Sequence, residues 1–230
     1  MKLAPLPEWP RAQLDASHQQ LLSRGSRWKP AVVRAVDADG RVRIVKDCRT
    51  VPIFTRWAAR LLMGRERRII RRLEGLEGFP CVLEHVDADA FTMVEMPGKV
   101  LDPETFSLAP RRIADSLLAR TAVMNERGVF HLDLRQRQNI LLGQGLELSI
   151  IDFGAAWAPN PVARWIFGGL LTNVDRSAAL KYLARFAPQH LTREEAQEVL
   201  RGMRKRKLWI LSPYRARGIE EAVRKHLQDM

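Results

Sequence analysis

The stretch HLDLRQRQN occupies residues 131–139, and DFG follows at residues 152–154, so that Asp152 stands 19 residues after Asp133. Each stretch adjoins a short apolar run of the kind that predicts a buried β-strand. These two runs lie at residues 139–142 and 146–151. We therefore expect the two aspartates on loops at the ends of one small hairpin.

Two carboxylates in this order and at this distance suit the transfer of a phosphoryl group. One of them, Asp133, would orient or deprotonate a hydroxyl, and the other, Asp152, would hold a magnesium ion against the phosphates of ATP. DFG and HxD are each short enough to arise by chance. Their order and separation together carry the prediction.

Length and composition predict a folded globular protein. With 230 residues and 46% hydrophobic content, the chain can bury a proper core as one large domain or two small lobes. Cys48 and Cys81 form neither a disulfide framework nor a Cys/His cluster, which favours a reducing compartment without a zinc site. Residues 1–11 lack the apolar region of a signal peptide. No run reaches the ~18 apolar residues of a membrane span, so we expect a cytoplasmic protein.

The net charge of +12 and the pI of about 10.6 indicate an anionic partner, either nucleic acid, anionic lipid or a phosphorylated substrate. Arginines crowd residues 56–72, and Arg204-Lys205-Arg206-Lys207 precedes Leu208-Trp209-Ile210. Solvated helix faces would explain both clusters without any partner. Basic residues beside Trp and Ile also suit an anionic membrane surface, here the inner face. Nucleic acid fits nearly as well and is the less favoured partner.

The first part of the chain has the pattern of a β-rich region with one helix. Residues 1–22 predict an irregular lead-in with a short helix, and a first strand is presumed before Gly25-Ser26. Asp37-Ala38-Asp39-Gly40 is a hairpin turn between two predicted strands. The four predicted strands from there on span 31–36, 41–46, 81–86 and 91–96. A helix is predicted over 55–76, with apolar positions at Leu61, Leu62, Ile69, Ile70 and Leu73 and stop signals at Gly75 and Gly78.

Pro97-Gly98 breaks the chain, and we place the division between a first domain, 1–97, and a second domain, 98–230, at this point. The second domain begins with a predicted helix over 111–127, stopped by Gly128. Its inner positions are Ile113, Leu117, Leu118 and Met124. Beyond the hairpin the pattern is mostly helical, with a capping box that starts at Thr192.

This order of elements resembles the protein-kinase-like superfamily over residues 20–185, and most of all its compact bacterial, RIO-like members, including lipopolysaccharide (heptose or Kdo) kinases. The resemblance implies an α+β bilobal fold, with a small β-rich N-lobe carrying one helix and a mostly helical C-lobe. It implies ATP and Mg²⁺ as cofactors. The acceptor would be a hydroxyl-bearing glycolipid, sugar or protein.

The resemblance assigns roles to residues of the N-lobe. Lys46 ends a strand similar to the Val-x-Ala-Lys element and would contact the α- and β-phosphates of ATP. Glu66, 20 residues later, would pair with that lysine. A solvent-exposed lysine and a surface glutamate are the alternatives. Residues 93–98 resemble the linker that holds adenine, with Glu95 and Met96 in contact through their main chain.

In the C-lobe, the resemblance makes Asp133 the catalytic residue and Asp152 the main magnesium ligand. Arg135 occupies the place where protein kinases often carry a lysine that contacts the γ-phosphate. His131 would support the loop. Asp175 would brace the backbone of the catalytic loop.

Three departures separate the chain from ordinary protein kinases. The second magnesium ligand is usually an Asn five residues after the catalytic Asp, whereas here Gln138 is fifth and Asn139 is sixth. Because Asn139 opens a matching apolar strand, we favour an inserted residue and Asn139 as the ligand. In place of a glycine-rich loop, Ser26, Arg27 and Lys29 would grip the phosphates less firmly.

The third departure is the short stretch of 23 residues between Asp152 and Asp175, which has no Ala-Pro-Glu and excludes a long activation segment. The sequence therefore predicts a kinase acting on a hydroxyl acceptor, with a cell-envelope glycolipid or sugar as the favoured candidate. An atypical RIO-like Ser/Thr protein kinase is the nearest alternative. A pseudokinase or anion-binding scaffold, and an RNA-associated ATPase, stay open as other classes.

Overall fold

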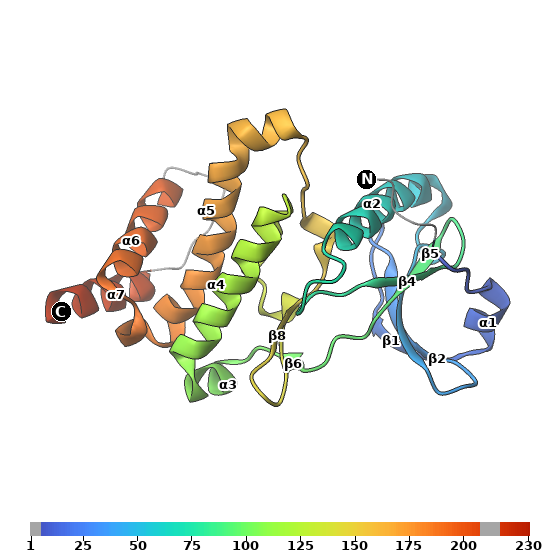
Figure 1. Cartoon of the computed structure of the whole chain (residues 1–230), viewed down its shortest axis with the longest axis horizontal. Helices are drawn as coiled ribbons and strands as arrows, with labels where there is room; N and C mark the ends of the chain where they lie inside the picture. The colour runs from blue at the N-terminus through green and yellow to red at the C-terminus, as the bar shows by residue number, and fades with distance from the viewer. Residues whose placement is uncertain (1–5, 208–216) are drawn as a thin grey trace. The chain divides into compact units, whose positions relative to one another are not determined.

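The computed structural model describes residues 6–207 and 217–230, with side chains at 6–203 and 218–230 (Figure 1). The chain folds into two compact units. One contains residues 1–97 together with 149–156, and the other contains 98–148 and 157–230. The predicted division at Pro97 assigned 149–156 to the second domain, whereas these residues pack with the first unit.

A five-stranded antiparallel sheet of order β1-β2-β3-β5-β4 forms the first unit together with two helices. The strands are β1 (His18–Ser23), β2 (Ala31–Val36), β3 (Val42–Asp47), β4 (Val82–His85) and β5 (Ala90–Met93), and the helices are α1 (Arg11–Ala16) and α2 (Ile53–Arg72). Residues 18–23 form an edge strand, so the predicted lead-in over 1–22 ends earlier than expected. Every residue of β1 is exposed, and no alternation of apolar and polar residues marks it.

The hairpin of β2 and β3 forms as predicted. Gly40 has φ +78°, a left-handed conformation that the tight turn requires and that glycine adopts without strain. Alternate residues of the two strands point into a core with α1 on one side, since Ala35 and Val45 are buried together with Trp9 and Leu14. The sheet therefore has one face closed by the N-terminal segment.

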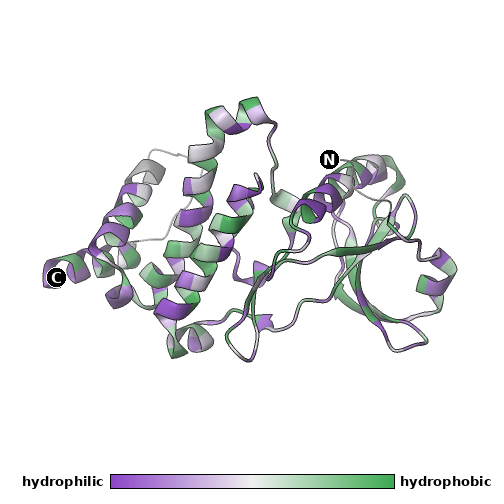
Figure 2. Ribbon diagram, in the orientation of Figure 1, coloured by the Kyte–Doolittle hydropathy of each residue, from purple (hydrophilic) through white to green (hydrophobic). Residues whose placement is uncertain are grey.

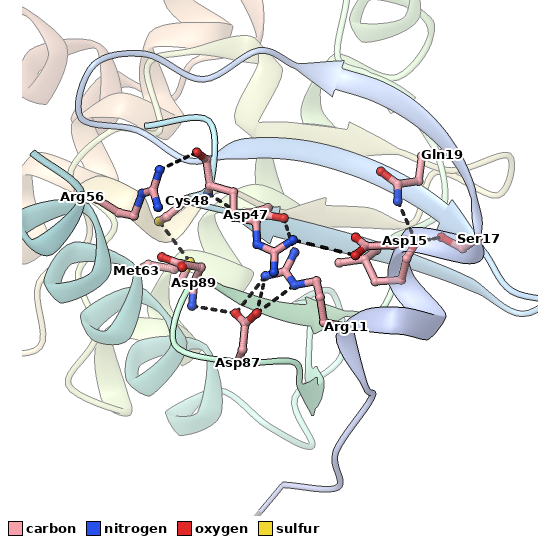
Figure 3. A network of polar contacts seen from close by, with 12 residues as sticks. Arg11, Asp15, Ser17, Gln19, Asp47, Cys48, Arg56, Met63, Asp87 and Asp89 are labelled. Carbon is pink, nitrogen blue, oxygen red and sulfur yellow. Dashed lines mark hydrogen bonds and ion pairs between the residues drawn. The ribbon is translucent and has the colours of Figure 1, made fainter. Parts of the chain in front are cut away.

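Polar contacts fasten α1 to the sheet (Figure 3). The guanidinium of Arg11 donates to both carboxylate oxygens of Asp87 at 2.8 Å and also to Asp47 of β3. The main-chain N–H of Trp9 donates to the carbonyl oxygen of His85 at 3.0 Å. Arg43 lies over the indole of Trp9, 4.6 Å from the ring centroid. These contacts tie the chain before β1 to both β3 and the β4–β5 turn.

Helix α2 turns one face toward the sheet. The buried residues on that face are Ala59, Met63, Glu66, Ile69 and Ile70. Two of the predicted apolar positions do not face the core, because Leu61 and Leu62 are exposed. The helix ends at Arg72, four residues before the predicted end at residue 76.

The second unit is mostly helical. It contains β6 (Lys99–Val100), α3 (Pro103–Leu108), α4 (Pro110–Glu126), β7 (Ile140–Leu142), α5 (Pro161–Phe186), α6 (Arg193–Lys207) and α7 (Arg217–Asp229), with β8 (Leu148–Ile150) beginning in it and ending in the first unit. Helices α4 and α5 lie side by side (Figure 1). Apolar and polar residues are interspersed along both (Figure 2). The buried apolar residues of the two helices include Ile113, Leu117, Met124 and Leu180.

Capping residues fix the ends of these helices. The side chain of Asn160 accepts the N–H of Ala163 at the start of α5. The predicted capping box is confirmed, because Thr192 and Glu195 each accept the main-chain N–H of the other, at 3.0 and 3.2 Å. Gly128 follows α4 with φ +71°, as predicted for a helix stop.

The structure bears on three further expectations, which concern a membrane span, the two cysteines and the basic run near residue 205. In the described part of the chain, no helix is both long and apolar enough to cross a membrane. Cys48 and Cys81 are free. The side chains of Arg204 to Lys207 and the residues Leu208-Trp209-Ile210 lie outside what the structure describes, so the expected contact of that run with a membrane stays a prediction.

Candidate functional site

The first unit brings three predicted site residues together. The Nζ atom of Lys46 on β3 lies 2.5 Å from Oε1 of Glu66 on α2 and 2.9 Å from Oδ1 of Asp152. Lys46 and Glu66 are 7% and 3% exposed, whereas the side chain of Asp152 is 49% exposed. The lysine head is therefore held by a buried carboxylate on one side and a half-exposed one on the other.

The charges of this group stabilise one another. Burial alone would lower the pKa of Lys46, but the carboxylates of Glu66 and Asp152 raise it above its ordinary value. Burial likewise would raise the pKa of Asp152, and the ammonium of Lys46 lowers it below the ordinary value. Both groups are thus charged near neutral pH. With two carboxylates and one ammonium, the group has a net negative charge, which would stabilise a further cation beside it.

Asp152 is held in an unusual backbone conformation. Its φ of +61° is left-handed, which is uncommon for a residue other than glycine and costs about 1 kcal/mol or more. Neighbouring residues hold the segment in place: Arg65 of α2 donates to the carbonyl oxygen of Gly154 at 2.7 Å, and Phe153 packs against Phe79 with ring centroids 6.3 Å apart. Strand β8 joins the same unit through the N–H of Ile150, which donates to Gly78.

The loop that stands in place of a glycine-rich loop is closed on itself. Gly25 has φ +69°, and a Cβ there would lie 2.5 Å from the carbonyl oxygen of Lys29, so only glycine fits. The hydroxyl oxygen of Ser26 accepts the N–H groups of Trp28 and Lys29, at 3.3 and 3.2 Å. The N–H of Ser26 donates to Lys29. These main-chain donors are therefore occupied within the loop.

Of the side chains in this loop, Lys29 acts on the site. Its charge contributes to lowering the pKa of Asp152. Arg27 instead contributes its carbonyl oxygen, which accepts the hydroxyl of Thr55 on α2 at 2.7 Å. Lys29 thus acts on Asp152 through its charge alone, since the structure defines no hydrogen bond or ion pair between the two residues.

The two linker residues differ in what they present. The carboxylate of Glu95 accepts a hydrogen bond from Arg34 of β2 at 2.8 Å, so its side chain is engaged at the surface of the sheet. Met96 is partly buried. The predicted main-chain contacts of Glu95 and Met96 with adenine stay a prediction.

The second unit contains the other group of predicted residues. The side-chain nitrogen of Asn139 donates to the carbonyl oxygen of Asp133 at 3.0 Å and lies 3.4 Å from its Oδ2. The amide of Gln136 also donates to Oδ2, at 2.6 Å. Asn139 is buried, whereas Gln138 is exposed and donates to Gln136. The structure therefore brings Asn139, and not Gln138, to Asp133.

A buried carboxylate braces this loop. Asp175 of α5 accepts the N–H of His131 at 2.8 Å and that of Leu132 at 2.7 Å, as its predicted bracing role requires. Leu132 has φ +65°, so these bonds hold a strained residue. Burial raises the pKa of Asp175 to about 6, although the two N–H groups act to lower it.

Two residues that the sequence did not single out complete the brace. The hydroxyl of Tyr182 donates to the carbonyl oxygen of Leu134 at 2.8 Å. In the orientation that satisfies its hydrogen bonds, the amide nitrogen of Asn125 donates to Oδ2 of Asp175 at 3.2 Å and to the carbonyl oxygen of Val129 at 2.9 Å. Tyr182 follows Asp175 by two turns of one helix, and this spacing is the only signal that could have predicted it.

Two predicted ligand residues carry donor atoms of the kind that Mg²⁺ prefers. Mg²⁺ prefers oxygen ligands and binds proteins through one or two carboxylates. Asp152 offers a half-exposed carboxylate in the first unit, and Asn139 offers an amide oxygen in the second. Among the described residues, no cluster of three or more His, Cys, Asp or Glu side chains could hold a metal ion alone. A zinc site of that kind is therefore not found in the described part of the chain.

The predicted residues thus fall into two sets, one in each unit. Lys46, Glu66 and Asp152 form the first, and Asp133 and Asn139 form the second, with Arg135 partly buried on the same loop. Comparison of the chain with protein-family models and with curated proteins gave no match.

Proposed function

We propose that this protein is a kinase: an ATP- and Mg²⁺-dependent phosphotransferase with a protein-kinase-like fold that phosphorylates a hydroxyl acceptor. The observation that carries the proposal is the position of Lys46 between Glu66 and Asp152. Burying a lysine and a glutamate costs free energy. Stability alone does not explain the pair, because hydrophobic residues in both positions would stabilise the fold as well. A rigidly held ammonium next to a half-exposed carboxylate suits the binding of phosphates and a metal ion.

The residues of this chain would divide the work. Lys46, aimed by Glu66, binds the α- and β-phosphates, and Lys29 adds charge from the loop. Asp152 and Asn139 would hold Mg²⁺, which when bound neutralises charge on the phosphates. Asp133 orients the acceptor hydroxyl and accepts its proton. Asn139 and Gln136 keep the carboxylate of Asp133 in one orientation. Arg135 would contact the transferred phosphoryl group.

For the acceptor we propose a cell-envelope glycolipid or sugar, met by a cytoplasmic protein at the inner face of the membrane. The net charge of +12 supports an anionic acceptor or surface. A Ser/Thr protein acceptor, as for RIO-like kinases, is the alternative. Incubation with radiolabelled ATP, Mg²⁺ and separated lipid and protein fractions of a cell extract would distinguish them by the fraction that becomes labelled.

A second candidate function, a pseudokinase or anion-binding scaffold, has a specific observation in its favour. Ser26 occupies the N–H groups of Trp28 and Lys29, which a phosphate-binding loop would present to ATP. Calorimetric titration with ATP and Mg²⁺, with labelling run in parallel, separates the two functions. Binding with transfer supports the kinase, and binding without transfer supports the scaffold.

The matched variants are Lys46→Ala at the site and Lys99→Ala on the surface of the second unit, where the side chain is exposed. We expect ATP binding to be lost in the first and kept in the second. If the wild-type protein binds no nucleotide with Mg²⁺, or if Lys46→Ala binds it equally well, the proposed function is wrong.

A further inference from the structure

Helix α2 exposes an apolar surface that no other described part of the first unit covers. Phe54 is 87% exposed, Trp57 64% and Leu61 65%, and Ile53 is exposed with them. The spacing of three and four residues places Phe54, Trp57 and Leu61 on one face of the helix. Scattered exposed hydrophobic residues are ordinary in proteins, but a contiguous group with two aromatic rings marks a site of interaction.

This surface is the side of α2 that points away from the sheet. The opposite face is buried through Ala59, Met63 and Ile70, which pack in the first unit. An orientation of the helix that buried Trp57 would expose those residues. The exposed apolar residues are therefore not needed for the packing of α2 itself.

The same face continues into a basic region without counter-charges. Arg68 and Arg72 follow Leu61 by seven and eleven residues, which is again the spacing of one helical face. Both are exposed, and among the described residues neither has a hydrogen bond or an ion pair that the structure defines. The helix contains one acidic residue, Glu66, which is buried against Lys46. The outer face of α2 thus combines apolar residues with unneutralised positive charge.

We propose that this outer face of α2, formed by Ile53, Phe54, Trp57, Leu61, Arg68 and Arg72, docks on the surface of an anionic lipid bilayer. The apolar residues would enter the headgroup region and the arginines would contact lipid phosphates. Charge complementarity identifies the partner, because a neutral surface would gain nothing from Arg68 and Arg72. Aliphatic residues such as Ile53 and Leu61 suit acyl chains and contribute little to stacking on nucleic-acid bases.

Helix α5 gives an informative contrast. Its first half also exposes apolar residues: Val162, Trp165, Ile166, Phe167 and Leu170. The one basic residue there, Arg164, donates to the carbonyl oxygens of Asn125 and Glu126, at 3.3 and 3.0 Å. That surface therefore lacks the free positive charge that selects anionic lipid, and the proposal is confined to α2.

Sedimentation of the full chain with vesicles tests the proposal. The probes are phosphatidylcholine vesicles with and without phosphatidylglycerol, at low and high salt and without nucleotide. We expect binding to the phosphatidylglycerol vesicles alone. Arg68→Gln/Arg72→Gln should weaken it by about 25-fold at low salt, since each arginine near the surface contributes about fivefold. Trp57→Gln/Leu61→Gln should weaken it by about tenfold or more, at either salt concentration.

Leu108→Gln/Arg112→Gln is the matched control, because both residues are exposed on the second unit and their replacement removes one apolar and one basic side chain. Loss of binding in this control, or equal binding by both α2 variants and the wild type, overturns the proposal. A dimer in light scattering that Trp57→Gln/Leu61→Gln converts to a monomer would overturn it too, and would identify the face as an interface between copies. Since no nucleotide is present, failure here leaves the proposed phosphotransferase untouched, and the reverse also holds.

Discussion

The side-chain nitrogen of Asn139 donates a hydrogen bond to the main-chain carbonyl oxygen of Asp133, 3.0 Å away and six residues earlier. The contact closes the loop between the two residues. It also fixes the amide of Asn139, so that its nitrogen faces Asp133 and its oxygen faces elsewhere. Gln138 is directed outward and donates to Gln136. If the loop carries one residue more than that of ordinary protein kinases, as we expect, that residue lies before Asn139, at the exposed positions.

Replacing these two residues separately should give very different activities. Asn139→Ala removes both the proposed ligand and the bond that closes the loop, and we expect phosphoryl transfer to fall by about 100-fold or more. Gln138→Ala removes an exposed amide and should stay within about twofold of the wild type. Steady-state kinetics with ATP measure both. Loss of activity in Gln138→Ala alone would show that Gln138 is the ligand and that no residue is inserted.

Breaking the buried ion pair should cost stability, whereas removing it entirely should not. Lys46→Met leaves Glu66 buried without its cation, and we expect a loss of about 3 to 5 kcal/mol in the free energy of unfolding. Lys46→Met/Glu66→Leu should recover most of that loss while remaining inactive. Urea denaturation monitored by circular dichroism gives the free energies. A double variant as unstable as Lys46→Met would contradict the coupling of the two residues.

The raised pKa of Asp175 predicts a dependence of stability on pH. Its pKa in the folded protein is about 6, above the ordinary 3.8, so the folded state favours the neutral form. Its contribution to stability is therefore full below pH 3.8 and is lost as pH rises through about 6. Compared with Asp175→Asn, the wild type should lose up to about 3 kcal/mol of stability over this interval.

Asn125 gives this prediction an independent check. Its amide nitrogen faces Asp175 at 3.2 Å and favours the charged carboxylate, so Asn125→Ala should raise the pKa of Asp175 further. The stability difference from the wild type should then grow as pH rises. A pH-independent difference would show that the amide contributes packing alone.

The ion pairs of Arg11 predict the opposite dependence of stability on pH, a loss in acid. Burial would raise the pKa of Asp87, but the hydrogen bonds from Arg11 and the N–H of Asp89 lower it below the ordinary 3.8. The stability it provides is therefore present above pH 3.8 and is lost as pH falls through the lower, folded value. Arg11→Gln should lower stability at pH 7 by about 1 to 3 kcal/mol and flatten this acid dependence. Arg112→Gln, at an exposed position, should change neither.

The loop that we propose to bind phosphates allows a comparison between Lys29 and Arg27. Lys29→Ala removes the charge that acts on Asp152, and we expect the KM for ATP to rise by about tenfold. Arg27→Ala keeps the carbonyl oxygen that accepts the hydrogen bond from the hydroxyl of Thr55, and it should change KM by about twofold or less. If Arg27→Ala has the larger effect, the assignment of the loop cation to Lys29 is wrong.

Local patterns in the sequence predicted most of the α+β architecture. The turn at Gly40, the stop at Gly128 and the capping box at Thr192 are set by short-range hydrogen bonds and backbone conformation, and each is found where expected. The interval between Lys46 and Glu66 likewise predicted a pair that the structure contains. Such features depend on residues near one another in the chain or on one known spacing.

Features that depend on tertiary packing could not be predicted in this way. A first strand was presumed before Gly25, but the bounds of β1 could not be predicted, because all its residues are exposed and it forms by pairing with the edge of β2. Leu61 was predicted as a core position because it is apolar, although its helix buries Met63 instead. The bond from Arg65 to Gly154 joins residues 89 positions apart, and nothing near either residue indicates it.

The assignment of residues 149–156 to the first unit has a consequence for dissecting the protein. The polypeptide passes between the units three times, after Pro97, after Leu148 and after Ala156. A fragment that ends at Pro97 would lack Asp152, and the carbonyl oxygen of Gly78 would lose the N–H of Ile150. Neither unit is therefore a contiguous piece of the gene product. Separate expression of the first unit requires residues 149–156 to be fused to it through an engineered linker.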